Sequence, residues 1–130
     1  MRGPVLDSLL LASRNPVRLS DWYAAALEPA EETDMDGYRV LRFGAFHVLI
    51  DHRDDVGDSN PEPARVILNF NVTDARAVAA RLDTMAVEWL APVEDRDGSL
   101  FATAIDPDGN YVQIIELAEA HQADAQADQG

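Results

Sequence analysis

The chain has 130 residues, of which 47% are hydrophobic, and 24 acidic residues against ten basic ones give a formal net charge of −14. A chain of this length forms one domain or two small modules that share a core. The negative charge repels phosphate backbones and anionic lipid surfaces, so nucleic-acid and membrane-surface binding are disfavoured. The chain has no cysteine, which excludes disulfides, thiolate metal sites and a thiol nucleophile.

The N-terminal stretch is apolar but short. About eight residues follow Pro4, and Asp7 interrupts them, which makes the stretch too short for a signal peptide or a membrane span. We therefore expect a soluble, cytoplasmic protein.

The first half begins with a predicted strand and helix. The strand runs from residue 6 to the helix N-cap residue Asn15. Pro16 occupies the first helical position, where its missing N–H does no harm. The apolar residues predicted to form one helix face are Val17, Leu19, Trp22, Tyr23, Ala26 and Leu27.

Three strands are expected after this helix. They are weakly indicated at residues 29–34 and clearly indicated at residues 38–43 and 45–50. Gly37 and Gly44 supply the turns between them.

Residues 51–64 are rich in Asp, Gly, Asn and Pro, which indicates a linker rather than a strand. Four aspartates gather there, but they lack the regular alternation and terminal bidentate Glu of a calcium loop. A solvated linker is therefore favoured. The aspartates are Asp51, Asp54, Asp55 and Asp58.

The second half repeats the first. Asp74 is the second helix N-cap residue, 59 positions after Asn15. The apolar residues of its helix are Ala75, Val78, Ala79, Leu82 and Met85. Strands are predicted at residues 87–93, 100–105 and 111–117, with turns at Asp97-Gly98 and Asp108-Gly109-Asn110. The tail, residues 118–130, has no apolar period and is expected to be flexible.

The chain therefore reads as two βαβββ modules, at about residues 5–50 and 65–117. Each helix can cover only one face of its sheet, so the other face needs a second wall, and a cleft is expected there. Alternation along the strands predicts that Leu9, Leu11, Leu68, Phe70 and Val72 meet the helices. The residues predicted to face the cleft are Ser8, Leu10, Ala12, Ile67, Asn69 and Asn71.

One stretch carries a family resemblance. In the segment from Asp106 to Leu117, the turn Asp-Pro-Asp-Gly-Asn leads into the strand Tyr-Val-Gln-Ile-Ile-Glu-Leu. This segment resembles the last hairpin of the vicinal oxygen chelate superfamily, which includes glyoxalases, bleomycin-resistance proteins and extradiol dioxygenases. The resemblance implies a single glyoxalase-like α+β domain over residues 1–117, with two βαβββ repeats forming a curved mixed sheet around a cleft. It also implies a homodimer.

Metal-binding members of the superfamily hold the ion with a His early in the first strand of each half and usually a Glu late in the fourth. By this resemblance the His positions fall on Ser8 and Ile67 and one Glu position falls on Gln113. The other falls on Val48, or on His47 or Leu49 after a one-residue slip. A catalytic metal needs about three protein ligands, so we expect no cofactor, and a divalent metal is not favoured. Glu116 is present but has the opposite parity.

Seven residues are candidates for binding a small molecule. Asn and Gln side chains that face the cleft would leave their amide groups without hydrogen-bond partners, at a cost of about 1–3 kcal/mol each. Buried water or neighbouring backbone could satisfy them, and so could a ligand. The candidates are Ser8, Arg42, His47, Asn69, Asn71, Tyr111 and Gln113.

Other aromatic and histidine side chains are interpreted as structural. Trp22, Tyr23 and Trp89 are expected in the core rather than in an aromatic ligand wall. His47 could be a base or a ligand donor, although a mid-strand His is more often structural. His52 and His121 are expected to be solvated.

Two functional hypotheses follow. The favoured one is a metal-free small-molecule-binding protein of the glyoxalase/bleomycin-resistance type, whose negative exterior would concentrate a cationic ligand. The alternative is a glyoxalase- or dioxygenase-like enzyme, a lyase, isomerase or oxidoreductase, in which His47, Gln113 and Glu116 rebuild a weaker site or an acid–base pair works alone. Structural pairing through a sheet edge is a weaker third interpretation. The motifs of serine hydrolases, P-loop NTPases, dinucleotide-binding proteins and zinc peptidases are missing from the sequence.

Overall fold

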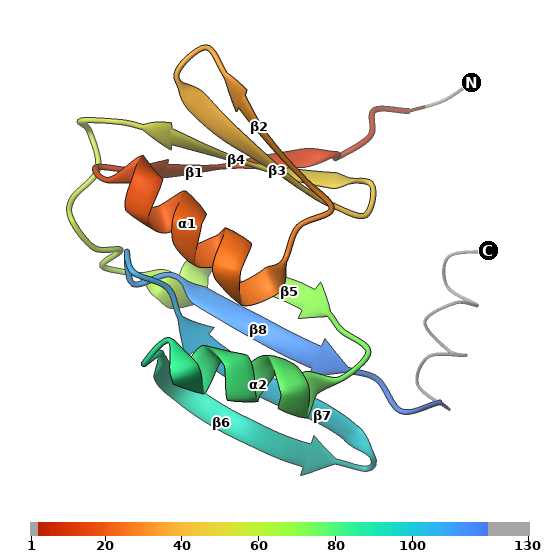
Figure 1. Ribbon diagram of the computed structural model, residues 1–130. Helices are drawn as coiled ribbons and strands as arrows, with labels where there is room; N and C mark the ends of the chain where they lie inside the picture. The colour runs from red at the N-terminus through yellow and green to blue at the C-terminus, as the bar shows by residue number, and fades with distance from the viewer. Residues whose placement is uncertain (1–2, 120–130) are drawn as a thin grey trace. The chain divides into compact units, whose positions relative to one another are not determined.

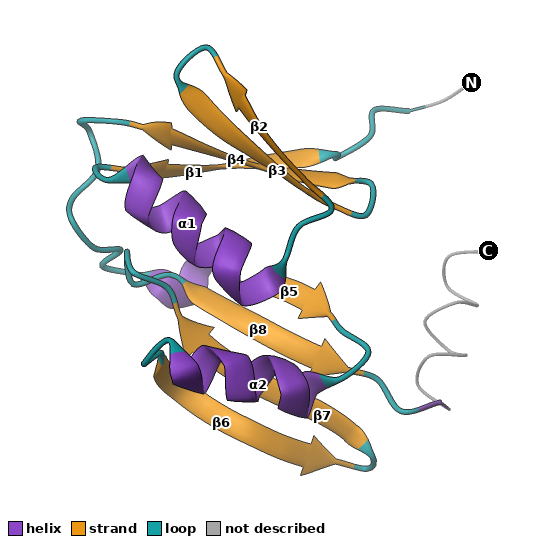
Figure 2. Ribbon diagram, in the orientation of Figure 1, coloured by secondary structure: helices purple, strands orange, loops and turns teal. Residues whose placement is uncertain are grey.

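The computed structural model describes residues 3–119, which divide into two compact units with the boundary between Asn60 and Pro61. Each unit has one helix lying across one face of a four-stranded sheet (Figures 1 and 2). The predicted α+β class and the two βαβββ units are confirmed. The tail predicted to be flexible lies almost entirely outside the described residues, as does His121.

The first unit contains β1 (Ser8–Ser13), α1 (Pro16–Leu27), β2 (Glu31–Met35), β3 (Tyr38–Phe43) and β4 (Phe46–His52). Its strands lie in the order β1-β4-β3-β2. The pair β1–β4 is parallel, whereas the other neighbours are antiparallel.

The second unit begins with a short 3-10 helix at Pro63–Arg65. It continues with β5 (Leu68–Asn71), α2 (Ala75–Thr84), β6 (Glu88–Arg96), β7 (Ser99–Ile105) and β8 (Tyr111–Glu116). The order β5-β8-β7-β6 repeats the topology of the first sheet, again with one parallel pair, β5–β8. No helix in the described part of the chain is long and apolar enough to span a membrane.

Both predicted helix starts are confirmed. The Asn15 side chain accepts a hydrogen bond from the backbone N–H of Arg18 at 3.2 Å, and Pro16 is the first helical residue. The Asp74 carboxylate accepts one from the backbone N–H of Ala77 at 3.0 Å. Each cap satisfies an N–H that would otherwise have no partner in the first turn.

Each core lies between the helix and one face of its own sheet. In the first unit Leu19 and Tyr23 of α1 are fully buried, as are Leu41 and Ile50 of the strands. Val17 was predicted on the same helix face, but it is 62% exposed. The reason is geometric, because two residues correspond to about 200° of rotation around the helix, which places Val17 opposite Leu19. The buried residues of the second unit include Ala79, Leu82, Ala102, Ala104, Val112 and Ile114.

Two strands are longer than expected. β4 continues through Asp51 and His52, which the sequence assigned to the linker, because β1 extends far enough to pair with both. β6 runs from Glu88 to Arg96 and contains two register shifts around Ala91. These irregularities, and Pro92 beside them, are tolerated because β6 is an edge strand.

The turn before β8 is held together by one carboxylate. One oxygen of Asp106 accepts the backbone N–H groups of Asp108 and Asn110, each at 2.9 Å, and the other accepts the Asn110 side-chain amide at 2.9 Å. Asp106 is only 4% exposed. Gly109 adopts a φ of 83°, which favours glycine. The predicted turn is therefore confirmed, and it sets where β8 begins.

We expect Asp106→Ala to lower the free energy of unfolding by about 2–3 kcal/mol, because it leaves several N–H groups without an acceptor. Asp106→Asn keeps one acceptor and should cost less. The measurement is urea denaturation followed by circular dichroism, with Asp58→Ala in the exposed linker as control. Equal midpoints for Asp106→Ala and the unchanged protein would contradict this role for the turn.

Candidate functional site

The candidate site is built on the sheet faces that the helices do not cover, called here the helix-free faces. In β4, Val48 and Ile50 are 2% and 0% exposed and pack on the α1 side. In β8, Val112 and Ile114 are fully buried on the α2 side. Because side chains alternate along a strand, the intervening residues point to the helix-free faces. All seven candidate residues have this parity.

Three candidates share one row on the first sheet. Ser8 is opposite His47, and His47 is opposite Arg42, which is opposite Glu31. The Arg42 guanidinium forms an ion pair with Glu31 at 3.2 Å and donates to the carbonyl of Gly44 at 2.8 Å. Its charge is therefore already paired within the protein.

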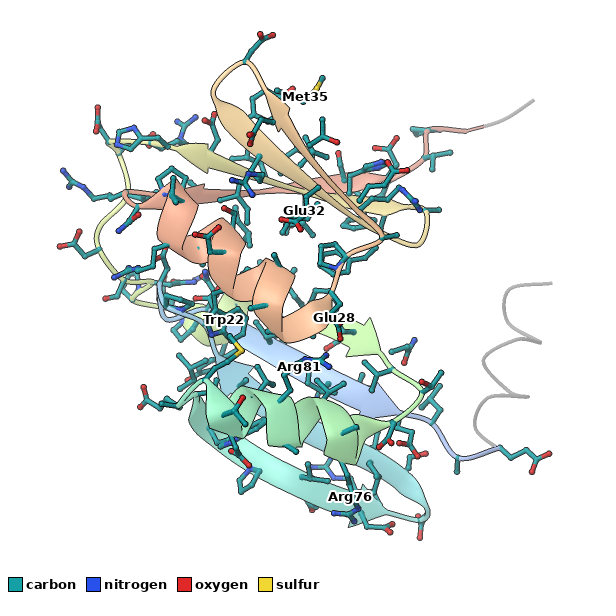
Figure 3. All side chains as sticks on the ribbon, in the orientation of Figure 1. Trp22, Glu28, Glu32, Met35, Arg76 and Arg81 are labelled. Carbon is teal, nitrogen blue, oxygen red and sulfur yellow. The ribbon has the colours of Figure 1, made fainter. Side chains whose placement is uncertain are left out.

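A shallow hollow of about 160 Å³ lies over this row. Met35, labelled on β2 in Figure 3, borders it and is 45% exposed. The next row is apolar at Leu10, Leu49 and Val40 and ends at Thr33 on β2. The hollow is lined by Glu31, Thr33, Met35, Val40, Arg42 and His47.

The second sheet presents a different surface. Asn69 is opposite Gln113 across the parallel pair β5–β8, and Gln113 is opposite Thr103 across the antiparallel pair β8–β7. These three side chains form one line across three neighbouring strands, which we call the polar row. Neighbouring strands are about 4.8 Å apart, so the row spans about 10 Å.

The polar row has no partners within the protein. Among residues 3–119, the side chains of Asn69, Gln113 and Thr103 form no hydrogen bond with any other residue. Every fully buried polar side-chain atom in that range has a hydrogen-bond partner. The polar atoms of the row have none, so they are not fully buried and remain accessible to solvent, even though Thr103 is only 9% exposed. They are available to a ligand.

The two rows beside it are mainly apolar. Ile115 and Phe101 are opposite each other on one side, and Tyr111 and Ile105 on the other. Asn71 continues the first of these rows on β5. The guanidinium of Arg96 lies 5.2 Å from the centre of the Phe101 ring and also pairs with Glu94 at 3.2 Å.

Thr103 was not among the candidates predicted from the sequence. The signal was present, because the turn at residues 106–110 brings Ile105 opposite Tyr111. Two residues further from the turn on each strand, Thr103 is opposite Gln113. No cleft-facing residue was predicted on the strand at residues 100–105, where Thr103 lies.

The register corrects the placement of one metal position. Of the three positions predicted for the first-half Glu, Val48 packs on the α1 side, whereas His47 and Leu49 point to the helix-free face. Gln113 is opposite Asn69, two residues after Ile67, and Leu49 is opposite Leu10, two residues after Ser8. The first-unit counterpart of Gln113 is therefore Leu49.

The four positions implied by the family resemblance thus hold Ser8, Leu49, Ile67 and Gln113. Two of these side chains are aliphatic and have no donor atom, so this set does not fit a divalent metal. Within residues 3–119, no group of three or more His, Cys, Asp or Glu side chains is placed to hold a metal ion.

Glu116 lies on the opposite face from Gln113. Its Oε1 accepts a hydrogen bond from the backbone N–H of Ala75, the first residue of α2, at 2.8 Å. A carboxylate in this place satisfies a free N–H and complements the positive end of the helix. The alternative site in which Glu116 joins Gln113 is therefore wrong.

The remaining aromatic predictions are mixed. Tyr23 is fully buried and contacts Trp22 edge-on, with 4.9 Å between ring centres, so its assignment to the core is confirmed. Trp22, labelled on α1 in Figure 3, is half-buried. Trp89 is also half-buried, and its indole N–H donates to Asp83 at 2.8 Å.

Two of the linker aspartates lie beside basic side chains. Arg53 pairs with Asp55, and this hydrogen bond lowers the pKa of the Asp55 carboxyl. His52 lies 3.3 Å from Asp54 and is exposed. The interpretation as a solvated linker agrees with these contacts.

No protein-family model and no curated protein matches the sequence. Solved structures do match. A virulence protein from Salmonella typhimurium is 20% identical, with a TM-score of 0.71 over 91% of this chain and 100% of that one. A glyoxalase/bleomycin resistance protein/dioxygenase from Nocardioides is 12% identical, with a TM-score of 0.71 over 92% of this chain and 87% of that one. The fosfomycin resistance protein FosX from Mesorhizobium loti is 15% identical, with a TM-score of 0.71 over 95% of this chain and 99% of that one. At these identities the likeness establishes the fold alone.

We expect Glu116→Ala to lower the free energy of unfolding by about 1–2 kcal/mol, because the backbone N–H of Ala75 loses its acceptor while the N-cap Asp74 stays in place. Glu116→Gln keeps a neutral oxygen acceptor and should cost less. Urea denaturation measures both, with Glu119→Ala as the matched control. If neither Glu116 variant changed stability, the assignment of this carboxylate as a helix cap would be wrong.

Proposed function

Because the chain has the vicinal oxygen chelate fold, which glyoxalase, bleomycin-resistance and dioxygenase neighbours share, we propose that it is a small-molecule-binding protein that works without the usual metal. The ligand lies on the helix-free face of the second sheet. The observation that carries this proposal is the polar row, three adjacent hydrogen-bonding side chains that no other described residue engages.

The energetics support a ligand that uses the whole face. Three hydrogen bonds contribute about 1.5–4.5 kcal/mol in total, since each contributes about 0.5–1.5 kcal/mol net. Micromolar affinity requires about 8 kcal/mol. The difference must come from apolar contact at about 25 cal/mol per Å². Ile115, Phe101, Tyr111 and Ile105 supply apolar surface on both sides of the row.

Binding is favoured over catalysis by the groups that this face contains. In most enzymes, the general acid or base is an ionisable side chain close to the reacting atom. On this face β5, β7 and β8 carry no Asp, Glu, His, Lys or Arg among the described residues. The enzyme alternative then depends on the Tyr111 phenol of this face or on His47, which belongs to the other sheet.

We expect the double variant Thr103→Val/Gln113→Leu to weaken ligand binding at least tenfold, because a loss of about 1.4 kcal/mol corresponds to a factor of ten. The ligand would come from a screen of drug-like fragments against 15N-labelled protein, read by the amide resonances of β5, β7 and β8.

The matched control is Ser59→Leu, a polar-to-leucine change in the exposed linker, which should leave affinity unchanged. A ligand that binds the double variant as tightly as the unchanged protein would refute the placement on this face. A screen in which no fragment moves these resonances would refute the binding function.

We also expect protein treated with a chelator and then titrated with Zn²⁺, Ni²⁺ or Mn²⁺ to show no stoichiometric submicromolar site in calorimetry. The physical reason is the lack of donor atoms at Leu49 and Ile67. A saturable site of that affinity would overturn the metal-free form of the proposal.

A further inference from the structure

We propose that the ligand of this face is a neutral, planar molecule with an amide, lactam or imide group on an aromatic frame. This inference rests on the proposed binding function and adds the chemical class of the ligand. It is carried by the charge, the hydrogen-bonding capacity and the apolar borders of the helix-free face of the second sheet.

The charge of the face favours a neutral ligand. Among residues 3–119, its ionisable Asp, Glu and Arg side chains are confined to the edge strand β6, at Glu88, Glu94 and Arg96. Glu94 and Arg96 pair with each other, so their charges are already balanced. An anionic ligand would lose water on the polar row and find no free positive charge, whereas the one negative charge left for a cation is Glu88 on β6, one strand beyond Ile105.

The hydrogen-bonding groups of the row favour an amide-like group. Asn69 and Gln113 each present a carbonyl acceptor and an NH₂ donor, and the Thr103 hydroxyl can do both. A carboxylate offers only acceptors and an amidinium offers only donors, so each would satisfy half of this capacity. An amide, lactam or imide offers a donor and an acceptor side by side and can match adjacent members of the row.

The borders of the row favour an aromatic frame. Tyr111 and Ile105 lie one row away, which is about 7 Å along the strands. On the other side, Arg96 already lies over the Phe101 ring. The side of the row toward Tyr111 is therefore the one with an aromatic ring free to stack against a planar ligand.

The net charge of −14 favours a cationic ligand instead, because it attracts cations from a distance. This attraction is screened over about 8 Å at physiological ionic strength. It changes how often a cation arrives, whereas the contacts of the face decide which molecule stays. A cationic ligand is therefore the rival outcome that the experiment must separate.

Three probes of almost equal shape separate these outcomes: benzamide, benzoate and benzamidinium. Each is a ring with a planar head group, and they differ in charge and in donors and acceptors. Each is titrated into the 15N-labelled full chain at physiological and at high ionic strength. The readout is the set of side-chain NH₂ resonances of Asn69, Asn71 and Gln113, assigned from the signals missing in the corresponding leucine variants.

We expect benzamide to shift these resonances in a saturable way, with affinity at least tenfold higher than either charged probe at high ionic strength. Gln113→Leu should weaken benzamide binding at least tenfold, and Ser59→Leu should not. If benzamidinium or benzoate bound this face as well as benzamide at high ionic strength, or if benzamide left these signals unmoved, the ligand class would be overturned. The proposed binding function is tested separately by the fragment screen, whose outcome does not depend on ligand charge.

Discussion

The constraint on which this structure depends is that each four-stranded sheet has one helix and two faces. Alternation along the strands divides the side chains, so the face under the helix collects Val48, Ile50, Val112 and Ile114, all nearly or fully buried. The intervening side chains point to the other face, which no helix covers. The side chains of the cores and those of the helix-free faces therefore alternate along the same strands, and a change on one face can leave the other intact.

The two modules share a topology but have helix-free faces of different chemistry. On the first sheet, the ion pair between Arg42 and Glu31 uses the charges internally. On the second sheet, Asn69, Gln113 and Thr103 are neutral and have no described partner. The two sheets therefore have the same strand order, while one helix-free face carries a paired charge and the other carries neutral polar side chains.

The four positions that the family resemblance assigns to a metal do not supply a donor set for a divalent ion in this chain. Leu49 and Ile67 provide no electron pair for a cation. The one carboxylate near the end of β8, Glu116, instead caps α2 from 41 residues further along the chain. The homodimer, the small-molecule ligand and the cytoplasmic location remain predictions.

The sequence by itself determined the features that depend on neighbours along the chain. The N-caps Asn15 and Asp74, the turn held by Asp106 and the alternation in β1 and β8 could all be recognised, because a few adjacent residues specify each. Tertiary structure decided what depends on register. Leu49 rather than Val48 matches Gln113, Thr103 completes the polar row, and Glu116 meets Ala75. These contacts join residues far apart in sequence, and the side-chain period of a strand is two, so a count that errs by one residue selects the wrong face.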